Sequence, residues 1–266
     1  MATFNSTTAP AGFSVGYNLA TGEAARIVFG GTAGTDVFTN ASGGLDWSVP
    51  GNWSMGALPS ASDTALISTG SGISYAVTHS TGTDNIAVLT INSGNSLDVS
   101  GGSLAVSGVT TVGGGLTVSG TGAATLIGSL NAGLTGAIAV SGGSLNLGAA
   151  STVNALNLTG GTVQGAGSLQ VTTQFSQTGG SIAMSGPVTI QQSVGDLSVG
   201  SISGAAITLL ASNGSIGQSA ALVTPGQLDT TSSNGTVLNI PVIRWAVLLH
   251  PIRGQLAISN CPILGL

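Results

Sequence analysis

The chain repeats a short turn sequence at nearly constant spacing. A Ser-Gly or Thr-Gly step that leads back into an apolar stretch occurs five times between residues 100 and 178, at intervals of about 20 residues. These steps begin at Ser100, Ser119, Ser141, Thr159 and Thr178. Two later copies, Ser212-Asn213-Gly214 and Ser233-Asn234-Gly235, are again about one repeat apart. A fixed period of about 20 residues predicts stacked units that bury their apolar faces against one another.

Between these turns, apolar residues recur at every second position in short bursts, which predicts strands with one face inward. The bursts are Leu89/Ile91, Leu97/Val99, Leu104/Val106, Leu116/Val118, Leu145/Leu147, Leu156/Leu158, Leu169/Val171, Ile182/Met184, Val188/Ile190, Leu197/Val199 and Ile207/Leu209. Glycine in the turns supplies the positive φ that lets the chain bend after each strand. We therefore predict an all-β fold, a parallel β-helix with coils of about 20 residues, right-handed because parallel crossovers usually are. About nine coils would make a rod on the order of 40 Å long.

Composition agrees with an ordered, weakly charged rod. Of the 266 residues 42% are hydrophobic and 4% are charged, against about 25% in ordinary domains. The chain has no lysine, and its three arginines, Arg26, Arg244 and Arg253, are dispersed. Nucleic acid and anionic membranes are recognised by clustered basic side chains, so neither is an expected partner. No apolar run reaches the roughly 18 residues of a membrane span, and none is expected.

Two segments do not follow the period. Residues 1–60 contain Trp47 and Trp53 and are interpreted as a cap over the end of the solenoid core, with a carbohydrate-stacking platform as the alternative for the two indoles. Residues 61–238 form the repeats. The first residues lack both the basic and the apolar region of a conventional signal peptide, so either export takes another route or the true start is missing.

Residues 239–266 differ abruptly from the repeats. They hold two of the three arginines and the only cysteine, Cys261, and contain no Gly-Gly turn. We interpret them as an atypical tail foreign to the array, from a frame-shifted or truncated reading of a longer gene. The alternative is a genuine C-terminal cap that uses Trp245, Leu248, Leu249 and Ile263.

Carboxylates are the first candidates for catalytic groups, because β-helices also occur in polysaccharide lyases and glycoside hydrolases. A glycosidase needs two carboxyl groups about 5–10 Å apart. Asp63 and Asp84 are about one repeat apart in the sequence and would stack on neighbouring coils if the register held, whereas Asp98 follows Asp84 after less than a repeat. A lyase would also need a basic group, and none occurs between Arg26 and Arg244.

Metal sites are weakly indicated. Residues 30–38 approximate one copy of a calcium-binding nonapeptide that includes Asp36, but such sites need successive copies. His79 and His250 lie on different segments without an acidic or cysteine cluster, so each is expected to face solvent or lie in a turn. Ice binding would require a threonine column along the coils, and the threonines are scattered. We therefore predict no catalytic, cofactor-binding or metal-binding residues.

Two stretches resemble known families. Asp46-Trp47-Ser48-Val49-Pro50-Gly51-Asn52-Trp53-Ser54, with the strands through Leu104 that follow, resembles bacterial surface proteins with autotransporter-type β-strand repeats. Residues 195–216 resemble repeats of filamentous-haemagglutinin-like adhesins. The resemblance covers about residues 46–238 and implies a passenger fragment of a bacterial adhesin, extracellular or on the cell surface, used in adhesion or biofilm contact.

The expected function is therefore a non-enzymatic structural and adhesive rod without cofactors. Its expected partner is a host or neighbouring-cell surface, with carbohydrate and end-to-end self-association as options. A β-helix lyase or glycoside hydrolase is the alternative function. The sequence leaves open the ligand, the export route and the oligomeric state.

Overall fold

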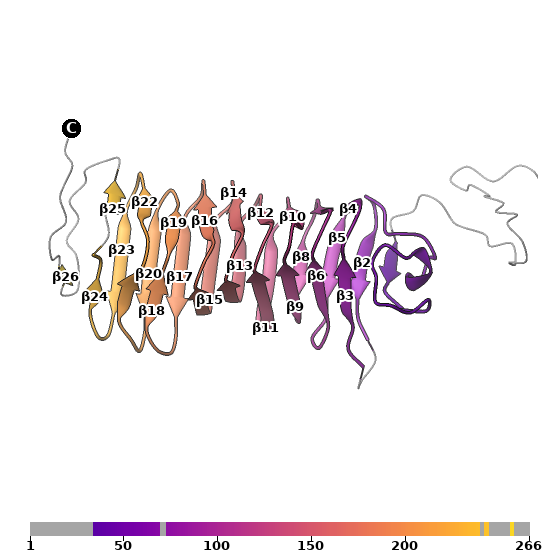
Figure 1. Ribbon diagram of the computed structural model, residues 1–266, viewed down its shortest axis with the longest axis horizontal. Helices are drawn as coiled ribbons and strands as arrows, with labels where there is room; N and C mark the ends of the chain where they lie inside the picture. The colour runs from indigo at the N-terminus through magenta and orange to yellow at the C-terminus, as the bar shows by residue number, and fades with distance from the viewer. Residues whose placement is uncertain (1–33, 70–72, 240–241, 245–255, 258–266) are drawn as a thin grey trace, which may run out of the picture.

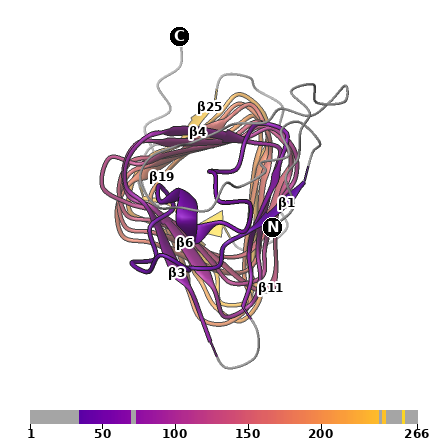
Figure 2. The ribbon, with the colours of Figure 1, turned by 90° about the vertical axis from the view of Figure 1, so that its right-hand side faces the viewer.

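The computed structural model describes residues 34–69, 73–239, 242–244 and 256–257, which form a rod of stacked coils (Figure 1). Seen along the rod, the coils superimpose as a rounded triangle (Figure 2). All strand ladders among the described residues are parallel, and most register partners are about one repeat apart, for example Ser151 with Leu169 and Thr110 with Leu130. The predicted β-solenoid, with about 9 turns and coils of about 20 residues, is confirmed.

The strands line three faces of the triangle, which we number in the order that the chain visits them. Face 1 contains β1 (Thr35–Val37), β2 (Thr64–Ile67), β5 (Val88–Ile91), β8 (Thr110–Val112), the first parts of β11 (Leu130–Val140), β13 (Ser151–Leu158) and β15 (Leu169–Gln177), then β17 (Val188–Gln192), β20 (Ile207–Ala211) and β23 (Leu228–Ser232). Face 2 contains β3 (Ala76–His79), β6 (Ser96–Val99), β9 (Gly115–Val118), the last parts of β11, β13 and β15, then β18 (Leu197–Val199), β21 (Ile216–Gln218), β24 (Thr236–Val237) and β26 (Leu256–Ala257). Face 3 contains β4 (Thr83–Ile86), β7 (Ser103–Val106), β10 (Ala123–Leu126), β12 (Ser144–Leu147), β14 (Thr162–Gly165), β16 (Ser181–Met184), β19 (Ser201–Ser203), β22 (Leu222–Thr224) and β25 (Val242–Arg244). The one helical element in the described part is a short 3-10 turn, η1 (Pro50–Asn52).

The core follows the alternation of the sequence. Both members of every apolar burst named above are buried inside the rod. The repeated Ser/Thr-Gly turns lie where the chain passes from face 2 to face 3. One glycine in each of these turns has a φ between 53° and 66°: Gly102, Gly120, Gly143, Gly161 and Gly180. Each of these sequence repeats therefore corresponds to one coil, with its Ser/Thr-Gly turn at the same corner and its alternating apolar residues on the inward faces.

Aromatic rings fill the N-terminal end of the core. Trp47 and Trp53 pack edge to face with ring centroids 4.6 Å apart, and Phe38 contacts Trp53 at 5.2 Å and Tyr75 at 5.5 Å. The exposed fractions of Trp47 and Trp53 are 0% and 2%. Since neither indole presents a face to solvent, the interpretation of the pair as a carbohydrate-stacking platform is wrong.

Parallel ladders extend into both atypical segments. β1, within residues 1–60, pairs with β2, and β25 and β26, within residues 239–266, pair with β22 and β24. The residues named for a C-terminal cap, Trp245, Leu248, Leu249 and Ile263, lie outside the described residues, as does Cys261.

Candidate functional site

The structure does not stack Asp63 on Asp84. Asp63 precedes β2 on face 1, and its carbonyl accepts hydrogen bonds from the backbone N–H groups of Ala87 and Val88, so its neighbour on the next coil is Ala87. Asp84 lies on face 3, in register with Leu104. The register that would stack them does not hold, because the first of these coils is longer than the repeat: the step from Ala65 to its partner Leu89 is longer than the step from Leu89 to its partner Thr110.

Asp98 lies apart from both of these residues. It belongs to β6 on face 2, where it is in register with Thr78 and Thr117. Both of its carboxylate oxygens accept from the Ser119 hydroxyl, at 2.8 and 3.1 Å. The three aspartates that sequence spacing suggested therefore lie on three different faces.

Asp63 instead lies near Asp36, and the two carboxyl groups have different environments. Burial raises the pKa of Asp36; hydrogen bonds from the Met55 N–H and the Ser54 hydroxyl oppose this, while the nearby Asp63 charge adds to it, so its pKa lies above the ordinary value. At Asp63 burial also acts to raise the pKa, but hydrogen bonds from Ser60 and from the Gly34 N–H outweigh it, so its pKa lies below the ordinary value. The pair thus combines a carboxyl group that keeps its proton more readily with one that loses it more readily.

Asp36 is also the acidic residue of the calcium-like nonapeptide. Residues 30–33 of that motif lie outside the described residues. One Asp36 oxygen, Oδ1, accepts from the Ser54 hydroxyl and from the Met55 N–H, both at 2.9 Å. Within the described part of the chain, no three His, Cys, Asp or Glu side chains gather as metal ligands.

His79 is buried, with none of its side chain exposed, so the expectation that it faces solvent or lies in a turn is wrong. It is the last residue of β3 and points into the core because it is in register with the buried Val99. Its Nε2 lies 2.8 Å from Asp84 Oδ2 and its Nδ1 lies 3.0 Å from the Gly101 carbonyl oxygen. Both ring nitrogens are engaged, so neither is free to act as a base toward a bound molecule. His250 lies outside the described residues.

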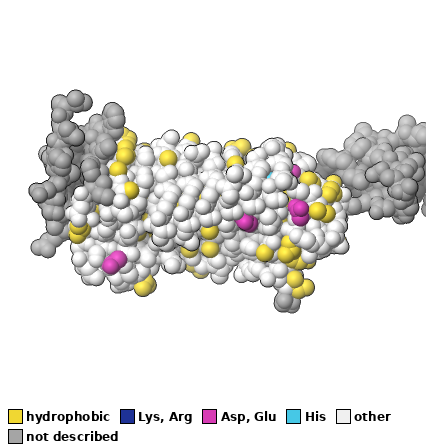
Figure 3. Space-filling model, in the orientation of Figure 1, with side chains coloured by type: hydrophobic (Ala, Val, Ile, Leu, Met, Phe, Trp, Pro, Cys, Tyr) yellow, Lys and Arg dark blue, Asp and Glu magenta, His cyan; other side chains and the backbone are white. Residues whose placement is uncertain are grey.

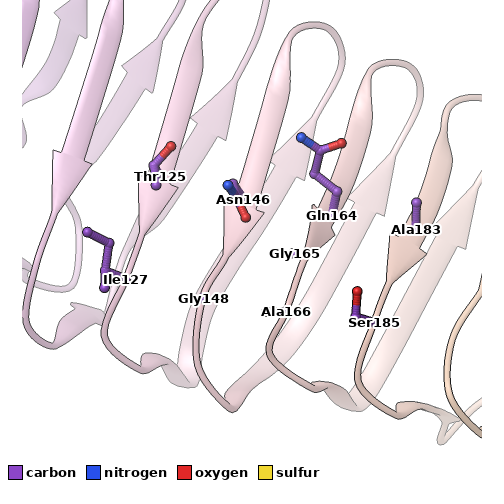
Figure 4. A pocket seen from close by; sticks show the side chains of 9 residues that line it. All are labelled: Thr125, Ile127, Asn146, Gly148, Gln164, Gly165, Ala166, Ala183 and Ser185. Atoms are coloured by element: carbon purple, nitrogen blue, oxygen red, sulfur yellow. The ribbon is translucent and has the colours of Figure 1, made fainter.

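A shallow groove lies on face 3, in the middle of the rod, and has a volume of about 470 Å³. It is lined by Thr125, Ile127, Asn146, Gly148, Gln164, Gly165, Ala166, Ala183 and Ser185, which come from β10, β12, β14, β16 and the turns after them (Figure 4). Thr125, Asn146 and Gln164 are in register on successive coils, followed by the small Ala183. The row of outward side chains therefore runs along the rod.

The groove combines polar and apolar side chains and holds no charged one. The structure contains no hydrogen bond from the side chains of Asn146 or Gln164 to another described residue, so both amides are available to a ligand. No Asp, Glu, Lys, Arg or His occurs anywhere between Asp98 and Asp196. The face seen in Figure 3 shows acidic side chains at only a few places. This lining can donate and accept hydrogen bonds with a neutral polar ligand, but it holds no acid or base for catalysis.

Sequence reasoning did not single out these groove residues, although a signal was present. Ser144-Leu145-Asn146 and Thr162-Val163-Gln164 each follow a Gly-Gly pair, with the polar amide at the third position. Aligning the repeats on their glycines would have placed Asn146 and Gln164 on one outward column. The sequence does not show that the small residues Gly165 and Ala183 leave a hollow beside these two amides.

Within the described ranges, no helix is long and apolar enough to cross a membrane. Comparison of the chain with protein-family models, with curated proteins and with solved structures found no match.

Proposed function

We propose that the chain is a non-enzymatic contact rod of a bacterial surface or secreted protein, and that the face 3 groove binds a neutral, hydroxyl-rich ligand such as a carbohydrate of the surface it contacts. The observation that carries this proposal is the row of Thr125, Asn146 and Gln164 in register along an uncharged stretch of the rod. Amide and hydroxyl groups can donate and accept hydrogen bonds, as sugar hydroxyls do. Adjacent coils at about 4.8 Å offer such groups at regular intervals to an extended polymer.

Lack of charge supports the same proposal. A ligand held by neutral hydrogen bonds should bind almost equally at low and high salt, because there is no ion pair to screen. An acidic polysaccharide would gain nothing from this surface, since residues 34–239 contain aspartates but no Lys or Arg.

The experiment is binding of the purified chain to an array of neutral and acidic glycans and to intact bacterial and host cells. The double variant Asn146→Ala/Gln164→Ala should weaken binding by roughly tenfold, since each neutral hydrogen bond contributes about 0.5–1.5 kcal/mol. The matched control is Asn157→Ala/Gln170→Ala, which removes the same side-chain types from exposed positions on faces 2 and 1. Equal binding by the two double variants would reject the groove as the contact surface.

A polysaccharide-active enzyme is the second candidate, and one observation favours it. The pKa of Asp36 lies above the ordinary value and that of the neighbouring Asp63 below it. Opposite shifts of this kind separate the acid from the base in glycosidases. Release of reducing ends from a polysaccharide by the chain, abolished by both Asp36→Asn and Asp63→Asn, would establish this reading and displace the contact rod. End-to-end self-association stays a prediction, to be tested by sedimentation at increasing concentration.

A further inference from the structure

The contact between His79 and Asp84 joins separate parts of the first coils. His79 ends β3 on face 2, and Asp84 lies in β4 on face 3, so their contact at 2.8 Å spans the corner between the two faces. The second ring nitrogen reaches the Gly101 carbonyl, 3.0 Å away in the Ser-Gly-Gly turn of the following coil. The imidazole therefore ties two strands of one coil to the turn of the next.

The hydrogen-bond partners of its two ring nitrogens indicate the protonation state of the His79 imidazole. The Gly101 carbonyl oxygen can only accept, so Nδ1 must carry a proton if that contact is a hydrogen bond. An ionised Asp84 carboxylate can also only accept, so Nε2 must carry a proton as well. Imidazole is a stronger base than carboxylate, so the second proton belongs on the ring. We propose that His79 is a buried imidazolium in the folded chain and that its second proton holds the N-terminal coils closed.

The surrounding groups favour the positive charge. The indole of Trp47 lies with its centroid 5.8 Å from that of the imidazole, within reach of a cation–π contact. The other titratable side chains on the neighbouring strands are acidic: Asp46, whose carboxylate accepts from the Ser48 N–H, and Asp98, whose carboxylate accepts from Ser119. Residues 34–239 contain seven aspartates and no Lys or Arg, so no neighbouring cation opposes protonation of His79.

Removing the second proton would place the lone pair of Nε2 against a carboxylate oxygen in the core. These two atoms would then repel each other, and the contact that spans the corner would open. The first coils should open in alkaline solution, whereas the coils between Asp98 and Asp196, which contain no ionisable side chain, should not respond.

Nitrogen NMR tests the protonation state directly. In the variant His250→Gln, His79 is the only histidine, so its two ring nitrogens can be observed without ambiguity in the full chain. We expect both nitrogens to be protonated at about pH 7, with the similar shifts that mark an imidazolium. The unequal shifts of a neutral ring at that pH would overturn the proposal.

Hydrogen exchange tests whether the first coils open when His79 loses its second proton. The amides of Trp47 and Thr78, bonded to Thr78 O and Leu45 O, should lose protection in alkaline solution after correction for intrinsic exchange. The control is His79→Val/Asp84→Leu, which copies Val99 and Leu104 from the next coil and keeps Asp36 and Asp63 in place. The control should show no such loss. Equal pH dependence in the parent and the control would contradict the proposal.

Discussion

His79 and Gln177 are the two polar members of one inward-facing column on face 2. The residues between them, in register from coil to coil, are Val99, Val118, Val140 and Leu158. Each polar end satisfies backbone groups of a turn: His79 the Gly101 carbonyl, and Gln177 the Gly200 N–H, which it accepts at 2.8 Å. The apolar middle of the column needs no such partner, because its strands pair with their neighbours continuously.

Gln177 lies where the ladder of face 2 is interrupted, between β15 and β18. We predict that Gln177→Leu destabilises the fold by about 1–3 kcal/mol, because the buried Gly200 N–H loses its acceptor. Chemical unfolding of the variant measures the loss. Gln170→Leu, an exposed position on β15, is the control and should change stability little. A smaller effect for Gln177→Leu than for the control would show that another group replaces the amide.

The glycine pairs are needed for space as well as for backbone conformation. Gly161 has a φ of +66°, and a Cβ there would lie 2.5 Å from the carbonyl oxygen of Gly142 on the preceding coil. Gly161→Ala should therefore cost at least about 1–2 kcal/mol from the left-handed backbone alone, with the contact adding to it. Gly133→Ala is the control, since its Cβ would meet nothing within 4 Å. Denaturant unfolding of both variants would reveal whether the two alanines differ; equal stability contradicts the prediction.

Some parts of this structure could be predicted from the sequence and others could not. The Gly-Gly spacing and the bursts of alternating apolar residues predicted the coils, the turns and the inward faces, because each depends only on local sequence. The positions of Asp63, Asp84 and His79 could not be read in the same way. Their neighbours depend on register, and the longer coil between Thr64 and Val88 shifts every residue before it relative to the later repeats. The pairing of His79 with Asp84 crosses a corner, which a period of about 20 residues does not describe.

Asp63 should stabilise the fold at neutral pH. Its carboxylate accepts from the Ser60 N–H at 2.8 Å, the Ser60 hydroxyl at 2.6 Å and the Gly34 N–H at 3.1 Å, and its pKa is lowered. A lowered folded pKa gives stability that is present above the unfolded pKa and lost as pH falls through the folded one. Asp63→Asn should therefore be less stable than the parent at about pH 7. The difference in the free energy of unfolding between the two should narrow below about pH 4. A gap that stays constant with pH would contradict this.

The contribution of Asp36 to stability should depend on pH in the opposite direction to that of Asp63. Its pKa is raised, mainly by burial, so its contribution is most favourable at low pH and is lost as pH rises through the folded pKa. Asp36→Asn retains an oxygen for the Ser54 hydroxyl and the Met55 N–H without the buried charge. We expect this variant to be at least as stable as the parent at neutral pH, with no advantage in acid. Thermal unfolding across the acid range tests both aspartates; a clear loss of stability for Asp36→Asn at neutral pH would mean that the charge itself is required.

The two indoles at the N-terminal end differ in one hydrogen bond. Trp53 Nε1 donates to the Trp47 carbonyl at 2.9 Å, whereas the buried Trp47 Nε1 has no partner among the described residues. Trp53→Phe should therefore cost about 0.5–1.5 kcal/mol more than Trp47→Phe, since both remove a similar apolar area but only the first removes a bond. Because coils interact mainly with their nearest neighbours, faster hydrogen exchange should be confined to the coils around β2 and β3 and should not reach β13. Equal losses for the two variants would indicate that ring packing, at centroids 4.6 Å apart, outweighs the hydrogen bond at this end of the rod.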